Sequence, residues 1–117
     1  MTDNELEEKL AKIMDEIPEI EGLIAFNKEG EILSGQTITE MDNQKIVTRA
    51  NELFKLALEL GEATEKEGIA EINLNSKDGN IIIEGSKKLG VIALVGKEAA
   101  HSLALIMRTL RALLSNS

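Results

Sequence analysis

Residues 21–35, with the sequence EGLIAFNKEGEILSG, decide the fold of this 117-residue chain. A strand over Gly22–Asn27 is predicted, and its uninterrupted apolar run indicates burial on both sides. The polar turn Lys28–Glu31 follows, in which Gly30 is free to adopt a positive φ angle. A second strand over Glu31–Ser34 completes the hairpin, and its short length suits the edge of a sheet.

A helix is predicted on each side of this hairpin. The first opens at Thr2, with Glu5 placed to complete a capping box, and Pro18 ends it. The second, central helix starts near Asp42, a favourable N-cap residue. Its apolar residues are Ile46, Val47, Ala50, Leu53, Phe54, Leu56, Ala57, Leu58, Leu60 and Gly61. They cover more than half of the helix circumference, so the helix is either sandwiched or covered in part by a second chain.

Three strands and a last helix are predicted after the central helix. The strand Ile69–Asn75 alternates apolar and polar residues, and the turn Lys77–Asn80 joins it to Ile81–Glu84 as a hairpin. The strand Leu89–Val95 is apolar on both faces, which indicates a central position, and a helix over Glu98–Leu114 follows. The sequence therefore predicts one α+β domain over residues 1–117: a five-stranded, mostly antiparallel sheet with three helices, in the order helix–strand–strand–helix–strand–strand–strand–helix.

Composition excludes several classes of function. Hydrophobic residues make up 43% and charged residues 29%, as in an ordinary globular domain. Cysteine is absent, which excludes disulfides, thiolate zinc sites and a cysteine nucleophile. The net charge of −8 argues against nucleic acid and against an anionic membrane as main partner. The acidic start and the lack of a long apolar segment lead us to expect a cytoplasmic protein without membrane insertion, and the lean composition fits a prokaryotic source.

A search for chemistry finds no catalytic constellation. Neither a Walker-type loop nor a dinucleotide fingerprint occurs, and Gly85–Lys88 lies between two strands, so we interpret it as a turn. His101 is the only histidine, which excludes two-histidine metal clusters and argues for a structural role. Glu62, Glu65 and Glu67 follow the central helix and are interpreted as part of a solvated loop, which is favoured over a metal site. We therefore predict no catalytic residue, no cofactor and no metal, and we do not expect an enzyme.

Arg49 on the central helix admits two interpretations. It has the chemistry to act as an arginine finger in the nucleotide pocket of a partner, or it is a solvated, salt-bridging helix residue. The second interpretation is favoured. The wide apolar arc of the central helix is the better functional lead, with burial under the sheet as the alternative explanation.

The layout resembles the roadblock / dynein light chain family over nearly the whole chain. The matching stretches are Glu21–Phe26 with the turn Lys28–Glu31, then Gly68–Leu74 and Gly90–Val95. These stretches are patterns of glycine and aliphatic residues, and the resemblance depends on their order and spacing together. It implies a profilin-like roadblock architecture.

The resemblance also implies a dimer, made with a second copy or with a related roadblock subunit. Two sheets would join edge to edge through Ile69–Asn75, and the central helices would lie side by side, which accounts for the wide apolar arc. The interface residues implied in this way are Val47, Leu53, Phe54, Leu56, Leu60, Ile69, Glu71, Ile72 and Asn73.

Three functions follow as hypotheses. The first, implied by the resemblance, is a non-catalytic dimeric platform that binds and regulates or scaffolds a small Ras-like GTPase. The second is a small-molecule sensor domain of profilin-like or PAS-like type, against which the 2% aromatic content weighs. The third, an enzyme, lacks a nucleophile with its base.

Overall fold

The computed structural model of the protein describes residues 2–99 and 101–115. Its elements are α1 (Asp3–Glu16), β1 (Ile20–Asn27), β2 (Ile32–Thr37), α2 (Asn43–Ala63), β3 (Glu71–Ser76), β4 (Gly79–Gly85), β5 (Leu89–Gly96), a 3₁₀ turn η1 (Lys97–Ala99) and α3 (Leu103–Ser115). The strands form one sheet in the order β2-β1-β5-β4-β3, and each neighbouring pair is antiparallel. The predicted α+β fold, the element order and the central position of β5 are confirmed.

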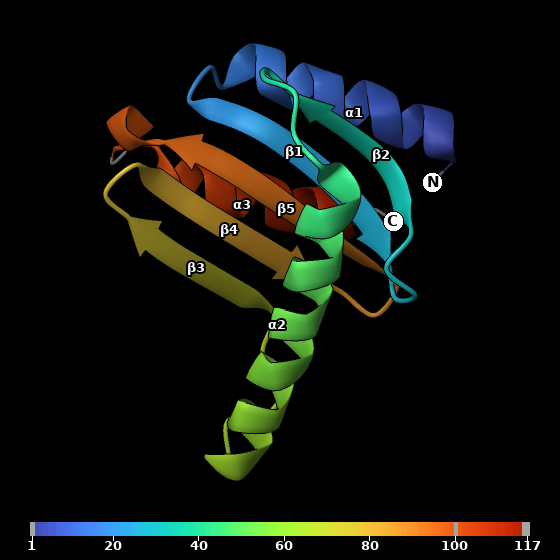
Figure 1. Cartoon of the computed structure of the whole chain (residues 1–117), viewed down its shortest axis with the longest axis vertical. Coiled ribbons are helices and arrows are strands. Elements are labelled where there is room, and N and C mark those ends of the chain that lie inside the picture. The colour runs from blue at the N-terminus through green and yellow to red at the C-terminus, as the bar shows by residue number, and fades with distance from the viewer. Residues whose placement is uncertain (1, 100, 116–117) are drawn as a thin grey trace.

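The sheet lies between two layers of helix. Helices α1 and α3 cover one face, and α2 crosses the other (Figure 1). The larger core fills the first side, with Leu10, Leu23 and Ile106 fully buried in it. The smaller core lies under α2, where Ile24, Val47 and others pack together. The strands β1 and β5 contribute to both cores, which explains why both are apolar throughout.

The predicted N-cap residues of the first two helices and the glycine of the first turn are found in those roles. Thr2 Oγ1 accepts a hydrogen bond from the backbone N–H of Glu5 at 3.2 Å and caps α1. Asp42 Oδ1 accepts one from Lys45 at 3.0 Å and caps α2. In the β1–β2 turn, Gly30 has a φ of +81°, which only glycine adopts readily.

Some predicted boundaries were wrong by a few residues. Strand β2 continues to Thr37, because backbone pairing with Gly22 of β1 does not depend on apolar side chains. Strand β3 begins at Glu71 and not at Ile69, since the chain first turns at Gly68 with a φ of +75°. Helix α3 begins at Leu103, after the short η1 turn, and not at Glu98 as predicted.

Candidate interaction surface

Helix α2 is only partly covered by its own chain. Its N-terminal half crosses the sheet and buries Val47 and Ala50, whereas its C-terminal half extends beyond the sheet (Figure 1). On that projecting half, the side chains of Leu56 and Leu60 are 61% and 64% exposed. Of the two explanations for the wide apolar arc, complete burial under the sheet is therefore wrong for the described residues.

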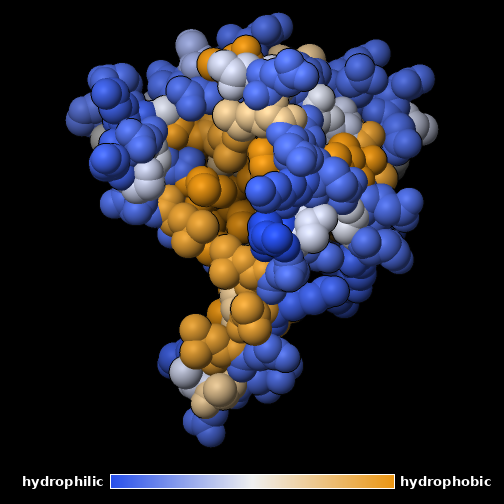
Figure 2. Space-filling view, in the orientation of Figure 1, coloured by the Kyte–Doolittle hydropathy of each residue, from blue (hydrophilic) through white to orange (hydrophobic). Residues whose placement is uncertain are grey.

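One side of α2, which we call the β3-side flank, forms an apolar groove with the sheet. The groove has a volume of about 340 Å³ between the first half of α2 and strands β3, β4 and β5. It is lined by Lys45, Ile46, Arg49, Ala50, Leu53, Leu74, Ile81, Ile83, Ile92 and Leu94. Leu56 and Leu60 lie three and seven residues after Leu53, so they extend the same helix face. Figure 2 shows this continuous apolar surface over the sheet and along α2.

The groove reaches an open edge of the sheet. Strand β3 pairs with β4 on one side, and among residues 2–99 and 101–115 no strand pairs with its other side. Its residues from Asn73 to Ser76 are exposed. An unpaired strand of this kind presents backbone N–H and C=O groups that another strand can pair with.

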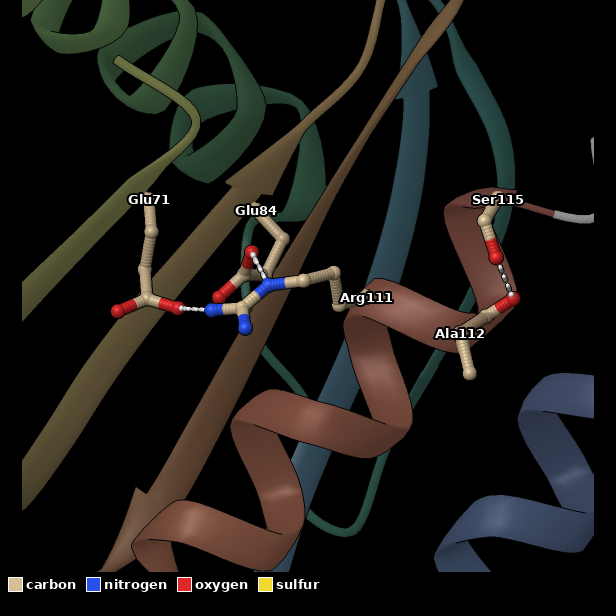
Figure 3. A network of polar contacts seen from close by, with 5 residues as sticks. All are labelled: Glu71, Glu84, Arg111, Ala112 and Ser115. Carbon is tan, nitrogen blue, oxygen red and sulfur yellow. Dashed lines mark hydrogen bonds and ion pairs between the residues drawn. The ribbon is translucent and has the colours of Figure 1, made fainter.

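A charged cluster lies on the opposite face of the same edge (Figure 3). Glu71 of β3 and Glu84 of β4 are partners in the strand register, and Arg111 of α3 points at both. Arg111 donates a hydrogen bond to Glu71 Oε1, and its Nε lies 3.8 Å from Glu84 Oε1. The Glu84 side chain is 1% exposed, and its Oε2 has no hydrogen-bond partner in the described part of the chain.

Two carboxyl groups thus share one guanidinium. Burial, followed by the neighbouring Glu71, raises the pKa of Glu84 to about 8, and the charge of Arg111 opposes this only in part. The pKa of Glu71 is lowered, chiefly because the Glu84 carboxyl can donate a hydrogen bond to it and also because of Arg111. The raised pKa favours the uncharged form of Glu84 at neutral pH, and the Arg111–Glu71 ion pair ties α3 to the start of β3. Glu84 was not among the residues predicted to be functional, although its position two residues after the inward-facing Ile82 indicates that its side chain also points inward.

The predicted interface residues do not all lie on one surface. Leu53, Leu56 and Leu60 belong to the β3-side flank, and Ile72 lies on the same face of the sheet, opposite Ile83. Glu71 and Asn73 lie on the α3 face instead. There, Asn73 accepts a hydrogen bond from Asn80 at 3.0 Å.

Three further members of the predicted interface pack against other parts of their own chain. Val47 is fully buried, and Ile69 packs on Gly61, where a Cβ would lie 3.0 Å from Ile69 Cδ1. Phe54 lies across Gly85 and faces the other side of α2, away from β3. The interface remains a prediction, and its members on the β3-side flank are Leu53, Leu56, Leu60 and Ile72.

The other residues considered for chemistry have ordinary surroundings. Arg49 forms an ion pair with Glu52 at 2.8 Å, and His101 is exposed. Ser86 accepts hydrogen bonds in the β4–β5 turn and supports its tight geometry. Within the described ranges, no group of three or more acidic or histidine side chains is placed to hold a metal ion. A helix with the length and apolarity needed to cross a membrane is also absent from these ranges.

The fold and surface define a class of protein: a five-stranded antiparallel sheet between two helix layers, with an open edge strand beside an apolar helix flank. The family model of the Roadblock/LC7 domain matches residues 6–96. The chain therefore belongs to the Roadblock/LC7 family. A comparison with proteins of curated function gives no match.

Solved structures of low sequence identity share the fold. MglB of Myxococcus xanthus matches with a TM-score of 0.84 and 7% identity, over 95% of this chain and 83% of that one. A Roadblock/LC7 domain of Streptomyces avermitilis matches with a TM-score of 0.82 and 12% identity, over 94% and 92%. A structure described as MglB with tetrameric arrangement matches with a TM-score of 0.77 and 11% identity, over 91% and 82%.

Proposed function

We propose that this chain is a non-catalytic platform, in which two roadblock domains pair and together bind and regulate or scaffold a small Ras-like GTPase. The observation that carries the proposal is the continuity of the β3-side flank with the open edge of β3. A second copy, or a related roadblock subunit, presents the same two features. Pairing therefore buries the apolar surface and also gives hydrogen-bond partners to the unpaired backbone groups of β3.

The exposed leucines supply much of the driving force for pairing. Full burial of a leucine side chain contributes about 1.5–3 kcal/mol, so Leu56 and Leu60 are the side chains with most to gain. The structure described as MglB with tetrameric arrangement supports self-association as a property compatible with this fold. Family membership supports the GTPase as the partner, because the roadblock resemblance implies platforms of that kind.

The first test is the solution mass of the purified chain. Light scattering with refractive-index detection suits this protein, because it contains no Trp or Tyr. We expect about twice the 12.8 kDa of one chain. The double variant Leu56→Glu/Leu60→Glu should give the mass of one chain, since pairing would bury two carboxylates. The matched control is Leu105→Glu on α3, a leucine that is 50% exposed away from this flank, and it should keep the wild-type mass.

The GTPase partner needs a separate test. Small GTPases encoded by the source organism, loaded with GTP or GDP, are used to capture the wild-type chain and the double variant. Retention of the wild type by at least one nucleotide state is expected, and loss of retention in the monomeric variant would tie binding to the paired form. Failure of every GTPase in both states would overturn the GTPase assignment, whereas a monomeric wild type would overturn the pairing.

A further inference from the structure

A second hollow lies on the other side of α2, which we call the β1-side flank. It has a volume of about 380 Å³ and is bounded by α2, the end of β1 and the β4–β5 turn. Its lining residues are Phe26, Asn27, Lys28, Asn51, Phe54, Lys55, Leu58, Gly85, Ser86, Leu89 and Gly90. The volume lies within the range of roughly 300–1,000 Å³ that is typical of small-molecule sites. Pairing through the β3-side flank would leave this hollow uncovered.

The floor of the hollow uses both phenylalanines of the chain and two facing glycines. The Phe54 ring lies over Gly85, where an added Cβ would be 2.6 Å from Cζ. The Phe26 ring lies over Gly90, where the same distance would be 2.4 Å. Neither glycine leaves room for a side chain, so the two rings form a close-packed apolar floor.

The rim of the hollow is positively charged, in contrast to the rest of the molecule. The chain carries 21 acidic and 13 basic residues, yet the lining includes two lysines and no aspartate or glutamate. Lys55 and Asn51 are four residues apart on α2 and so share a face, and Lys28 follows the end of β1. Within the described ranges, neither lysine is in an ion pair and the Asn51 carboxamide has no hydrogen-bond partner.

We infer that the hollow on the β1-side flank binds a small organic anion, with its apolar body against the Phe54 ring and the apolar lining beside it, and its carboxylate or phosphate at the ammonium groups of Lys28 and Lys55. The Asn51 amide can donate a hydrogen bond to the same anionic group. This surface is distinct from the one proposed for pairing, so the inference does not depend on the proposed function. It gives the small-molecule hypothesis raised by the sequence a definite location and ligand class.

The experiment compares octanoate with octanol, which has the same chain but no charge. Each is titrated into the ¹⁵N-labelled full chain, and amide shifts are followed by NMR. Octanoate should shift the amides of residues 26–28, 51–58 and 85–90, and octanol should bind more weakly. Phosphate monoesters of short alcohols form a second series, which distinguishes a phosphate ligand from a carboxylate ligand.

The variant Lys28→Glu/Lys55→Glu should weaken octanoate binding by about tenfold or more. Both side chains are exposed, so the fold should be kept. The matched control is Lys45→Glu, a lysine at the rim of the other groove, and it should bind octanoate as the wild type does.

Added salt should weaken octanoate binding to the wild type more than octanol binding, which tests the charge contribution without any variant. Equal affinity for octanoate and octanol would overturn the inference. So would shifts confined to the β3-side flank, unchanged binding by the double variant, or the absence of saturable shifts with every anion.

Discussion

The two flanks of α2 lie over the same face of one sheet, but they call for different partners. The β3-side flank is a long apolar strip beside an open strand edge, an arrangement that suits pairing with a second domain. The β1-side flank is a compact hollow with an aromatic floor and a lysine rim, which a small anion can fill. Leu53 and Phe54 are neighbours in the sequence and yet belong to different flanks, because successive helix residues are about 100° apart.

The largest effect on stability is expected from adding a side chain at Gly90, which would displace the Phe26 ring from the floor of the hollow on the β1-side flank. In Gly90→Ala the new Cβ would lie 2.4 Å from Cζ of Phe26, a ring that is only 4% exposed and has little room to move. We expect the free energy of unfolding to fall by about 1–3 kcal/mol, the usual cost of overpacking a core. Urea unfolding followed by circular dichroism measures this change.

Substitutions at two other glycines provide comparisons for the stability change in Gly90→Ala. Gly85→Ala should cost less, because the Phe54 ring that it meets borders the open hollow and can rotate into it. Gly35→Ala on β2 should change stability little, since its Cβ would meet neighbours only at 3.5 Å. If all three variants lost the same stability, the close-packed floor of the β1-side flank would be wrong.

The second effect concerns the cluster of Glu71, Glu84 and Arg111, which lies on the opposite face of the sheet from the β3-side flank, and it depends on pH. Because the pKa of Glu84 is raised from 4.5 to about 8, the folded state keeps a proton that the unfolded state releases between these values. The stability that this proton contributes is present at low pH and is lost as the pH rises to about 8. The Glu84→Gln variant has no proton to release, so this loss of stability disappears. Between pH 5 and 8, its free energy of unfolding should rise by about 1 kcal/mol or more relative to that of the wild type.

Denaturant unfolding at several pH values measures this slope. Glu71, whose pKa is lowered, acts in the opposite sense: its contribution is present above its ordinary pKa and is lost as the solution becomes more acidic. The matched control is Glu8→Gln on the exposed side of α1, which should follow the wild-type profile. Parallel profiles for wild type and Glu84→Gln would show that Glu84 is ionised throughout.

The fold was predictable because its signals are local. The caps at Thr2 and Asp42 and the turn at Gly30 act through residues within four positions, and apolar runs identify β1 and β5 as interior strands. The ends of β2 and β3 were less predictable. The former depends on backbone pairing with β1, and the latter depends on the turn at Gly68 that precedes it.

The surfaces were less predictable because they depend on distant parts of the chain. The apolar arc of α2 was evident, but its division into two flanks depends on where the helix crosses the sheet. The lysine rim joins the turn after β1 to α2, and the cluster around Glu84 joins β3, β4 and α3 across 40 positions of sequence. The sequence pattern alone predicts neither the angle at which α2 crosses the sheet nor the register of the strands.

The smallest effect is expected at Arg49, on the rim of the β3-side groove. Its ion pair with Glu52 is exposed, with the two side chains 70% and 60% accessible, so Arg49→Ala should change stability by less than about 0.5 kcal/mol. An arginine finger behaves quite differently, since its removal lowers GTP hydrolysis by about 10³–10⁵-fold. Single-turnover hydrolysis by a captured GTPase, measured with wild-type chain and with Arg49→Ala, separates these roles. Equal rates are expected of a platform, because any acceleration then arises from the conformation that the paired domains impose on the GTPase. A large loss of rate with binding retained would mean that Arg49 enters the nucleotide site, and the chain would then supply chemistry as well as a surface.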